Sequence, residues 1–169
     1  MSRRWLLRSG VVAAVLVALL AMTGCGLLLR KGVESATGVK VDQGTGKTTV
    51  TGKNGETATI QEGKIPDGLP SDFPVYQGTV KLGNKVTTGE GTTFSIVIET
   101  TDDAKTVGDW YDAKLKAAGW KIDGRNDVTT NGKSITTISA TSGSKQAMII
   151  AGESADTTQN SVNITLTVK

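Results

Sequence analysis

The chain has 169 residues, with 19 Lys and Arg, 16 Asp and Glu, one Cys and no His. Without histidine it lacks the usual general base near neutral pH and the commonest transition-metal ligand, which excludes His-based catalytic triads. Three arginines before Cys25 account for the whole net charge of +3, and every acid lies after it. The residues from Cys25 onward are therefore formally neutral, which gives no electrostatic basis for nucleic-acid binding.

The N-terminal segment is typical of an export signal. The basic stretch MSRRWLLR leads into the uncharged run VVAAVLVALLAM, in the order expected of a signal peptide. The residues Met22, Thr23 and Gly24 before Cys25 resemble the lipobox of bacterial lipoproteins. The resemblance implies cleavage between Gly24 and Cys25 and a diacylglycerol on the Cys25 sulfur. We therefore expect residues 1–24 to be a signal peptide and the mature protein to be anchored by lipid at the outer face of the cell membrane.

Two alternatives concern this segment. Residues 11–29 carry no charge and are flanked by Arg8 and by Arg30 and Lys31, so an uncleaved transmembrane helix also fits. Either arrangement keeps the basic end inside and the remaining chain outside. The stretch SRRWLLR resembles a twin-arginine signal, whereas the strongly apolar run favours the general secretory route, so the export route stays open.

Residues 25–40 are interpreted as a tether, residues 41–62 as a β-hairpin and residues 63–76 as a connector. The Asn-Gly pair at 54–55 predicts the hairpin turn. A three-residue loop with Gly55 left-handed would pair Val50 with Ala58 and Thr48 with Ile60, which gives the hairpin one apolar face.

The connector contains all three prolines of the chain, each preceded by an apolar residue. Proline at every fourth position excludes a helix and a central strand. We expect an extended segment that lies against the domain through Ile65, Leu69 and Phe73.

Residues 77–169 are interpreted as one domain. Phe94, Ile96 and Ile98 alternate on one face of a strand. The stretch after residue 100 predicts one helix, capped by Asp102 or Asp103 and ended by Gly119. Its apolar stripe is Val107, Trp110, Tyr111, Leu115 and Ala118.

Four further strands follow the helix, and the last alternates Val162, Ile164, Leu166 and Val168 with polar residues. The predicted fold class is α+β. It comprises an antiparallel sheet of the order β-β-α-β-β-β-β with one helix packed on one face, preceded by an accessory β-hairpin and the proline-spaced connector.

Several of these stretches resemble a group of small uncharacterised bacterial lipoproteins, mostly from Gram-positive organisms. The markers are the lipobox, the Phe-Pro-Val-Tyr-x-Gly element at 73–78 and a helix that ends in Ala-Gly-Trp at 118–120. The resemblance supports location and fold, and it implies no active site.

Candidate catalytic groups are few. Ser142 and Lys145 have S-x-x-K spacing and Ser161 to Asn163 follow, yet the Lys-Thr-Gly element of penicillin-binding enzymes is missing. The stretch GTGKTT lacks the first glycine of a phosphate-binding loop and precedes a strand. The acids Asp102, Asp103, Asp109 and Asp112 are better explained by helix capping and a solvated helix face than by acid–base chemistry.

We therefore expect a protein that is not an enzyme and has no cofactor, no metal and no catalytic residue. The leading hypothesis is an interaction or scaffold module that the lipid on Cys25 holds at the membrane and that contacts a protein or cell-wall partner. The alternative is an extracytoplasmic binding protein for a small ligand or wall polymer. Trp110 and Trp120, at opposite ends of the helix, would be its ligand surface, although core packing also explains both residues. An enzyme using carboxylates or Ser142 is the third reading.

Overall fold

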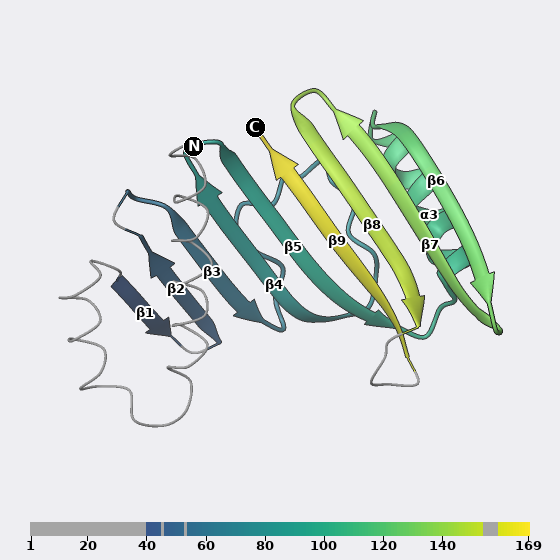
Figure 1. Ribbon diagram of the computed structural model, residues 1–169, viewed down its shortest axis with the longest axis horizontal. Coiled ribbons are helices and arrows are strands. Elements are labelled where there is room, and N and C mark those ends of the chain that lie inside the picture. The colour runs from purple at the N-terminus through teal and green to yellow at the C-terminus, as the bar shows by residue number, and fades with distance from the viewer. Residues whose placement is uncertain (1–39, 45, 53, 154–158) are drawn as a thin grey trace, which may run out of the picture.

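The computed structural model describes residues 40–44, 46–52, 54–153 and 159–169. Within these ranges the chain forms one antiparallel sheet of nine strands with one α-helix against it (Figure 1). The sheet order is β1-β2-β3-β4-β5-β9-β8-β7-β6. The elements are β1 (Lys40–Gly44), β2 (Lys47–Thr51), β3 (Thr57–Glu62), β4 (Thr79–Thr88), β5 (Gly91–Thr100), α3 (Ala104–Ala117), β6 (Lys121–Thr130), β7 (Lys133–Ser142), β8 (Lys145–Glu153) and β9 (Asn160–Val168).

The helix carries the chain from the middle of the sheet to its far edge. After β5 the chain passes through α3 and enters β6 at the edge of the sheet. Each following strand pairs antiparallel with the one before it, and the last, β9, also pairs with β5. Asp103 caps the helix, because its carboxylate accepts a hydrogen bond from the Thr106 N–H at 2.7 Å. Gly119 adopts φ +79° just beyond the helix, as expected of a glycine that ends one.

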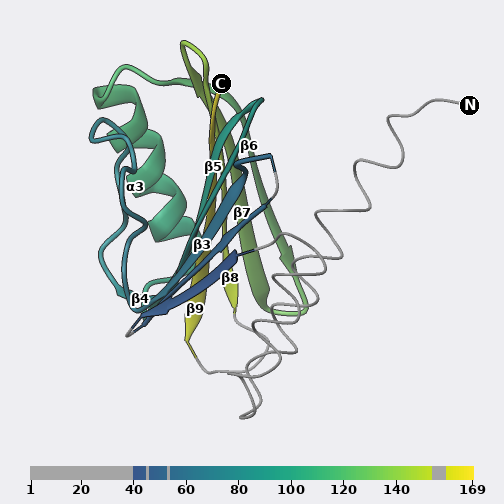
Figure 2. The same cartoon turned by 90° about the vertical axis from the view of Figure 1, so that its left-hand side faces the viewer.

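The helix and the connector lie on the same side of the sheet (Figure 2). We call this side the covered face and the opposite side the open face. On the covered face one row of paired residues contains four isoleucines that are at most 1% exposed, contributed by β5, β9, β8 and β7: Ile96, Ile164, Ile149 and Ile138. Val107, Tyr111 and Leu115 of α3 are fully buried as well, so the stripe and the isoleucine row belong to one core.

The predicted fold class is wrong in its arrangement of elements. The hairpin is not an accessory unit, because β3 pairs with β4 along its whole length, with Thr57 opposite Thr87 and Glu62 opposite Leu82. A further strand, β1, pairs with β2. Five strands thus precede the helix and four follow it, all in one sheet. The unpaired backbone groups along one edge of β4 bond to β3. The turn residues of the hairpin carry no information about this pairing.

The internal register of the hairpin is as predicted. Val50 pairs with Ala58 and Thr48 with Ile60, and Gly55 has φ +80°. A left-handed glycine in a three-residue loop sets this register. Local turn chemistry therefore predicted the pairing within the hairpin correctly, while its place in the sheet was missed.

Two expectations about apolar residues need correction. Ile65 is 42% exposed, so of the three proposed connector anchors only Phe73 is buried, and Leu69 packs partly against the core. Ala118 is exposed, and Gly108 takes a buried place on the helix. Neither the helical period nor the proline spacing specifies where the connector and β7 pack. These patterns therefore did not predict which of these residues would be buried.

Candidate functional site between the helix and the connector

The connector places two aromatic rings beside α3, in the core on the covered face of the sheet. Phe73 is 4% and Tyr76 is 8% exposed. Phe73 meets the Trp120 ring edge-on with centroids 5.4 Å apart. Tyr76 lies 5.0 Å from the Trp110 ring and 6.1 Å from the Tyr111 ring. Tyr76, Trp110 and Tyr111 form one aromatic cluster, and Phe73 and Trp120 form a separate pair. Edge-on pairs at such distances stabilise beyond the area that they bury.

Polar contacts fix the connector to the helix and its entry. The Tyr76 N–H donates to the Tyr111 hydroxyl oxygen at 3.1 Å. The Tyr76 hydroxyl donates to a carboxylate oxygen of Asp102 at 2.6 Å. Burial first, and then this hydrogen bond to Asp102, raises the pKa of Tyr76 to about 12. Burial also raises the pKa of Tyr111. Both phenols therefore stay protonated near neutral pH.

A second set of contacts joins the connector to the far end of the helix. The Trp120 indole N–H donates to the Asp72 carbonyl oxygen at 3.3 Å. Lys145 forms an ion pair with the Asp72 carboxylate and lies 5.5 Å from the centroid of the Trp120 ring. Trp120 is 3% exposed, so the connector, Phe73 and Lys145 enclose this side chain.

The two tryptophans proposed as a ligand surface occupy different environments. Trp110 is half-buried beside Tyr76 and Tyr111, and Trp120 is buried beside Phe73. Core packing was the other explanation for both residues, and these contacts agree with it for Trp120. Their role in ligand binding stays a prediction.

The carboxylates near the helix have specific partners. Asp103 caps α3, and Asp112 pairs with Lys116 at 2.6 Å. Asp109 pairs with Lys105 at 2.7 Å and with Arg125 of β6 at 2.8 Å. Hydrogen bonds from Lys105 and Arg125 hold the pKa of Asp109 below its ordinary value. Each of these acids therefore has a capping or ion-pairing role.

Sequence patterns did not reveal the close contact between α3 and β7. A Cβ atom on Gly108 would lie 2.6 Å from the Thr136 methyl carbon and 3.1 Å from an Arg125 nitrogen. Thr136 donates to Asp127 at 2.7 Å, and Asp127 accepts from Arg125 at 3.0 Å. Glycine at position 108 therefore lets the helix approach this network. A glycine within a helical stripe was the available signal.

Other predicted groups are placed as follows. Ser142 pairs with Lys145 across the turn between β7 and β8, and the Lys145 ammonium contacts Asp72. In the described part of the chain no three Asp, Glu, Cys or His gather where they could hold a metal ion. Within the same part, no helix has the length and hydropathy needed to cross a membrane. Gly24 and Cys25, the predicted cleavage and lipid-attachment residues, lie outside the described residues.

Comparison with known proteins adds one family. A model of the START domain-like family matches residues 80–167, which is more than half of the chain. The chain therefore belongs to the START domain-like family. This fold is a helix-grip sheet, and its domains generally bind ligands and are not catalytic. A search of curated proteins gave no match to the chain.

Proposed function

We propose that this member of the START domain-like family is a non-catalytic interaction module that a lipid on Cys25 holds at the outer face of the cytoplasmic membrane. The sequence around Cys25 supports the address, because an apolar run bounded by basic residues ends in a lipobox-like stretch. Two acyl chains on one cysteine would give stable anchoring, whereas a single chain gives only marginal binding.

The observation that carries the interaction role is the close packing of the connector against α3 on the covered face. Phe73 and Tyr76 from the connector and Tyr111 from the helix are all at most 8% exposed. These side chains belong to the core of the covered face. The outer surfaces of the domain therefore remain for contact with a protein or wall partner.

The non-catalytic part of the proposal is supported by the engaged state of the candidate groups. Asp102 accepts from Tyr76, Asp103 caps α3, and Lys145 pairs with Asp72. A general base must lie within hydrogen-bond distance of a substrate proton. These side chains are instead bonded to other residues of the same chain. We expect Ser142→Ala and Asp102→Asn to leave the cellular phenotype of the intact gene unchanged.

Lipid attachment is tested with the full chain expressed in a bacterial host and labelled with an alkyne analogue of palmitate. The intact chain should incorporate label and sediment with membranes, and Cys25→Ala should lose the label. Ser142→Ala, far along the chain from the lipobox, serves as the matched control and should keep it. A mature protein that begins at Met1 with an unmodified Cys25 would replace the lipid with an anchor helix.

The partner is sought by crosslinking in intact cells and mass spectrometry of what is captured by the full chain. A specific protein or a wall fragment that is lost with Cys25→Ala would support an interaction module at the membrane. Equal capture of unrelated envelope proteins by the intact chain and by Cys25→Ala would contradict it.

A second candidate, an extracytoplasmic binding protein for a small apolar ligand, is favoured by the family match. The connector has no strand or helix of its own, and its outward movement would uncover the part of the core that Phe73 and Tyr76 occupy. Titration with oleate should then change tryptophan emission in a saturable way. In a chain that begins at Cys25 and so lacks Trp5, Trp110→Phe isolates the signal of Trp120, which lies beside Phe73. The interaction module predicts no saturable change.

A further inference from the structure

The open face of the sheet contains a band that carries no charge. One row of paired residues crosses six strands from β4 to β6, and its members are Leu82, Val97, Asn163, Ile150, Thr137 and Asn126. The neighbouring row consists of Asn84, Ser95, Thr165, Met148, Ser139 and Gly124. We call these two rows the neutral band. Six adjacent strands of the nine-stranded sheet contribute to this band.

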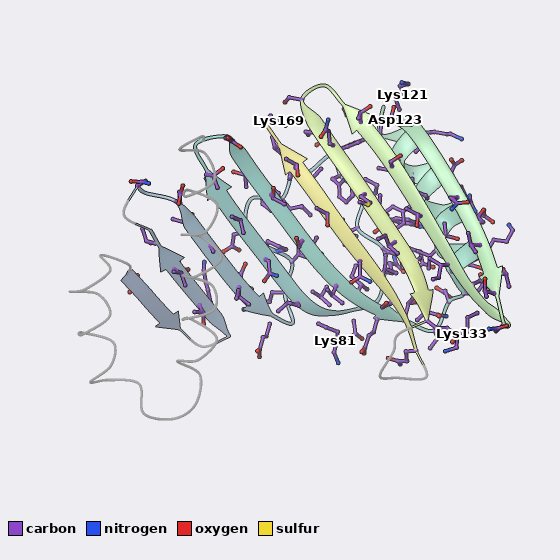
Figure 3. The ribbon with its side chains drawn as sticks, viewed as in Figure 1. Lys81, Lys121, Asp123, Lys133 and Lys169 are labelled. Atoms are coloured by element: carbon purple, nitrogen blue, oxygen red, sulfur yellow. The ribbon has the colours of Figure 1, made fainter. Side chains whose placement is uncertain are left out.

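On the open face, charged residues lie toward the two ends of these strands and not in the neutral band. Figure 3 shows Lys121 and Asp123 at one end of the sheet and Lys81 and Lys133 at the other. Lys121 pairs with Asp123 at 3.1 Å, and Lys133 pairs with Glu153 at 2.8 Å. An uncharged centre bordered by ion pairs has the composition of a protein interface with a polar rim.

Large apolar side chains are exposed on this side of the sheet. Ile150 is 38% exposed and Met148 is 46% exposed. Ile135 and Val128, which pair with each other on β7 and β6, are 49% and 46% exposed. Four of the five large apolar side chains that are exposed in the described chain therefore lie together on the open face. A contiguous group of this kind marks an interaction surface.

The chemistry of the neutral band selects the partner. The open-face rows contain no aromatic ring for stacking against a sugar, because the described aromatic residues lie in the covered layer. They also contain no lysine or arginine for an anionic lipid or a phosphate. A partner that matches the band must be uncharged and aliphatic, with hydroxyl and amide groups.

The open face of a second copy has these properties. A two-fold interface sets the same surface against itself, so a charge close to the two-fold axis would face the same charge on the other copy. The neutral band avoids this repulsion, and its Ser, Thr and Asn side chains can each donate and accept. The whole open face of these six strands, with the neutral band at its centre and the charged residues at its rim, covers about 900 Å² at ordinary strand spacing, close to the roughly 800 Å² that each partner of a stable interface buries.

We propose that two copies of this chain dock face to face through the neutral band and the adjoining Ile135 and Val128. The contact forms a sheet-on-sheet layer like that between the two sheets of a β-sandwich. The contact requires neither the lipid on Cys25 nor any partner protein. Its test is therefore independent of the tests of the proposed function.

The test uses two full-length copies with different epitope tags, expressed together and solubilised in mild detergent. One tag should co-isolate the other copy, and light scattering should give the mass of a dimer. Ile150→Lys places like charges in the contact, and it should reduce co-isolation at least tenfold. Ala113→Lys, on the exposed surface of α3, is the matched control and should change nothing. Circular dichroism checks that both variants fold.

A charge exchange makes the test specific. Ile150→Lys on one copy and Ile150→Asp on the other should restore co-isolation that each variant loses when paired with itself. A monomeric intact chain at tens of micromolar would overturn the proposal. A dimer that survives Ile150→Lys would also overturn it, because the contact would then use another surface. Binding of the monomeric intact chain to phosphatidylcholine vesicles, abolished by Ile150→Lys, would assign the open face to membrane instead.

Discussion

The two faces of the sheet share the same strands but have different environments. On β8, Ile149 points to the covered face and is 1% exposed, while its neighbour Ile150 points to the open face and is 38% exposed. On the covered face, α3 and the connector bury an aliphatic layer and an aromatic cluster. On the open face, similar aliphatic side chains have no such cover within the described chain. The comparison teaches that alternation along a strand divides residues between two faces, while other elements decide which face becomes the core.

The largest expected effect comes from truncating the two neighbouring isoleucines. Ile149→Ala should lower the free energy of unfolding by about 3 kcal/mol, because it removes buried apolar contacts and leaves a cavity. Ile150→Ala should lower it by less than about 1 kcal/mol at protein concentrations where the chain is monomeric. Urea denaturation of the intact chain and both variants measures the difference. Equal losses would show that the open face is as tightly packed as the covered face.

A smaller effect is expected where the helix approaches the covered face. Gly108→Ala should destabilise by about 1–2 kcal/mol even though alanine favours helices, because its methyl group would clash with the Thr136 methyl carbon. Thermal denaturation followed by circular dichroism measures the loss. Combining it with Thr136→Ser removes that methyl carbon and keeps the hydroxyl that donates to Asp127, so the double variant should recover stability. Failure to recover would place the clash elsewhere.

The smallest effect concerns the hydrogen bond that ties the connector to the helix entry. The pKa of Tyr76 is raised to about 12 in the folded chain, against about 10 in the unfolded chain. The folded state therefore holds this proton more tightly. Its stabilisation is complete below pH 10 and is lost as the pH rises from 10 to about 12.

Tyr76→Phe tests this pH dependence. The variant lacks the titrating hydroxyl, so its free energy of unfolding should decline less between pH 10 and 12 than that of the intact chain. At pH 7 it should be slightly less stable, because the Asp102 carboxylate loses a donor. Urea denaturation across the pH series measures both. Parallel curves for the two proteins would show that Tyr76 does not titrate in this range.

Sequence patterns predicted the parts of the fold that depend on neighbouring residues. The alternation of Phe94, Ile96 and Ile98, and of Val162, Ile164 and Leu166, was confirmed, since all six are buried. The Asn-Gly turn set the register of β2 and β3, and Asp103 capped the helix as expected. Each of these features arises from a two-residue period, a turn that needs a left-handed glycine, or a capping side chain.

The predicted location at the cell surface rests on the sequence alone. The basic start, the apolar run and Cys25 predict export and lipid attachment, and these residues lie outside the described part of the chain. For the candidate ligand surface, the sequence identified Trp110 and Trp120. It did not reveal that Asp72, Phe73 and Lys145 enclose Trp120, because Trp120 and these residues come from three distant segments.

Only the tertiary structure decided how the segments are assembled. It joined β1, β2 and β3 to the main sheet through β4, and it brought side chains of the connector into the core of the covered face. It also gathered uncharged residues of six strands into one band on the open face. Local patterns state which side chains share a face of one strand. The neighbours of that face are chosen by pairing and packing between residues far apart in the chain, where each contact depends on all the others.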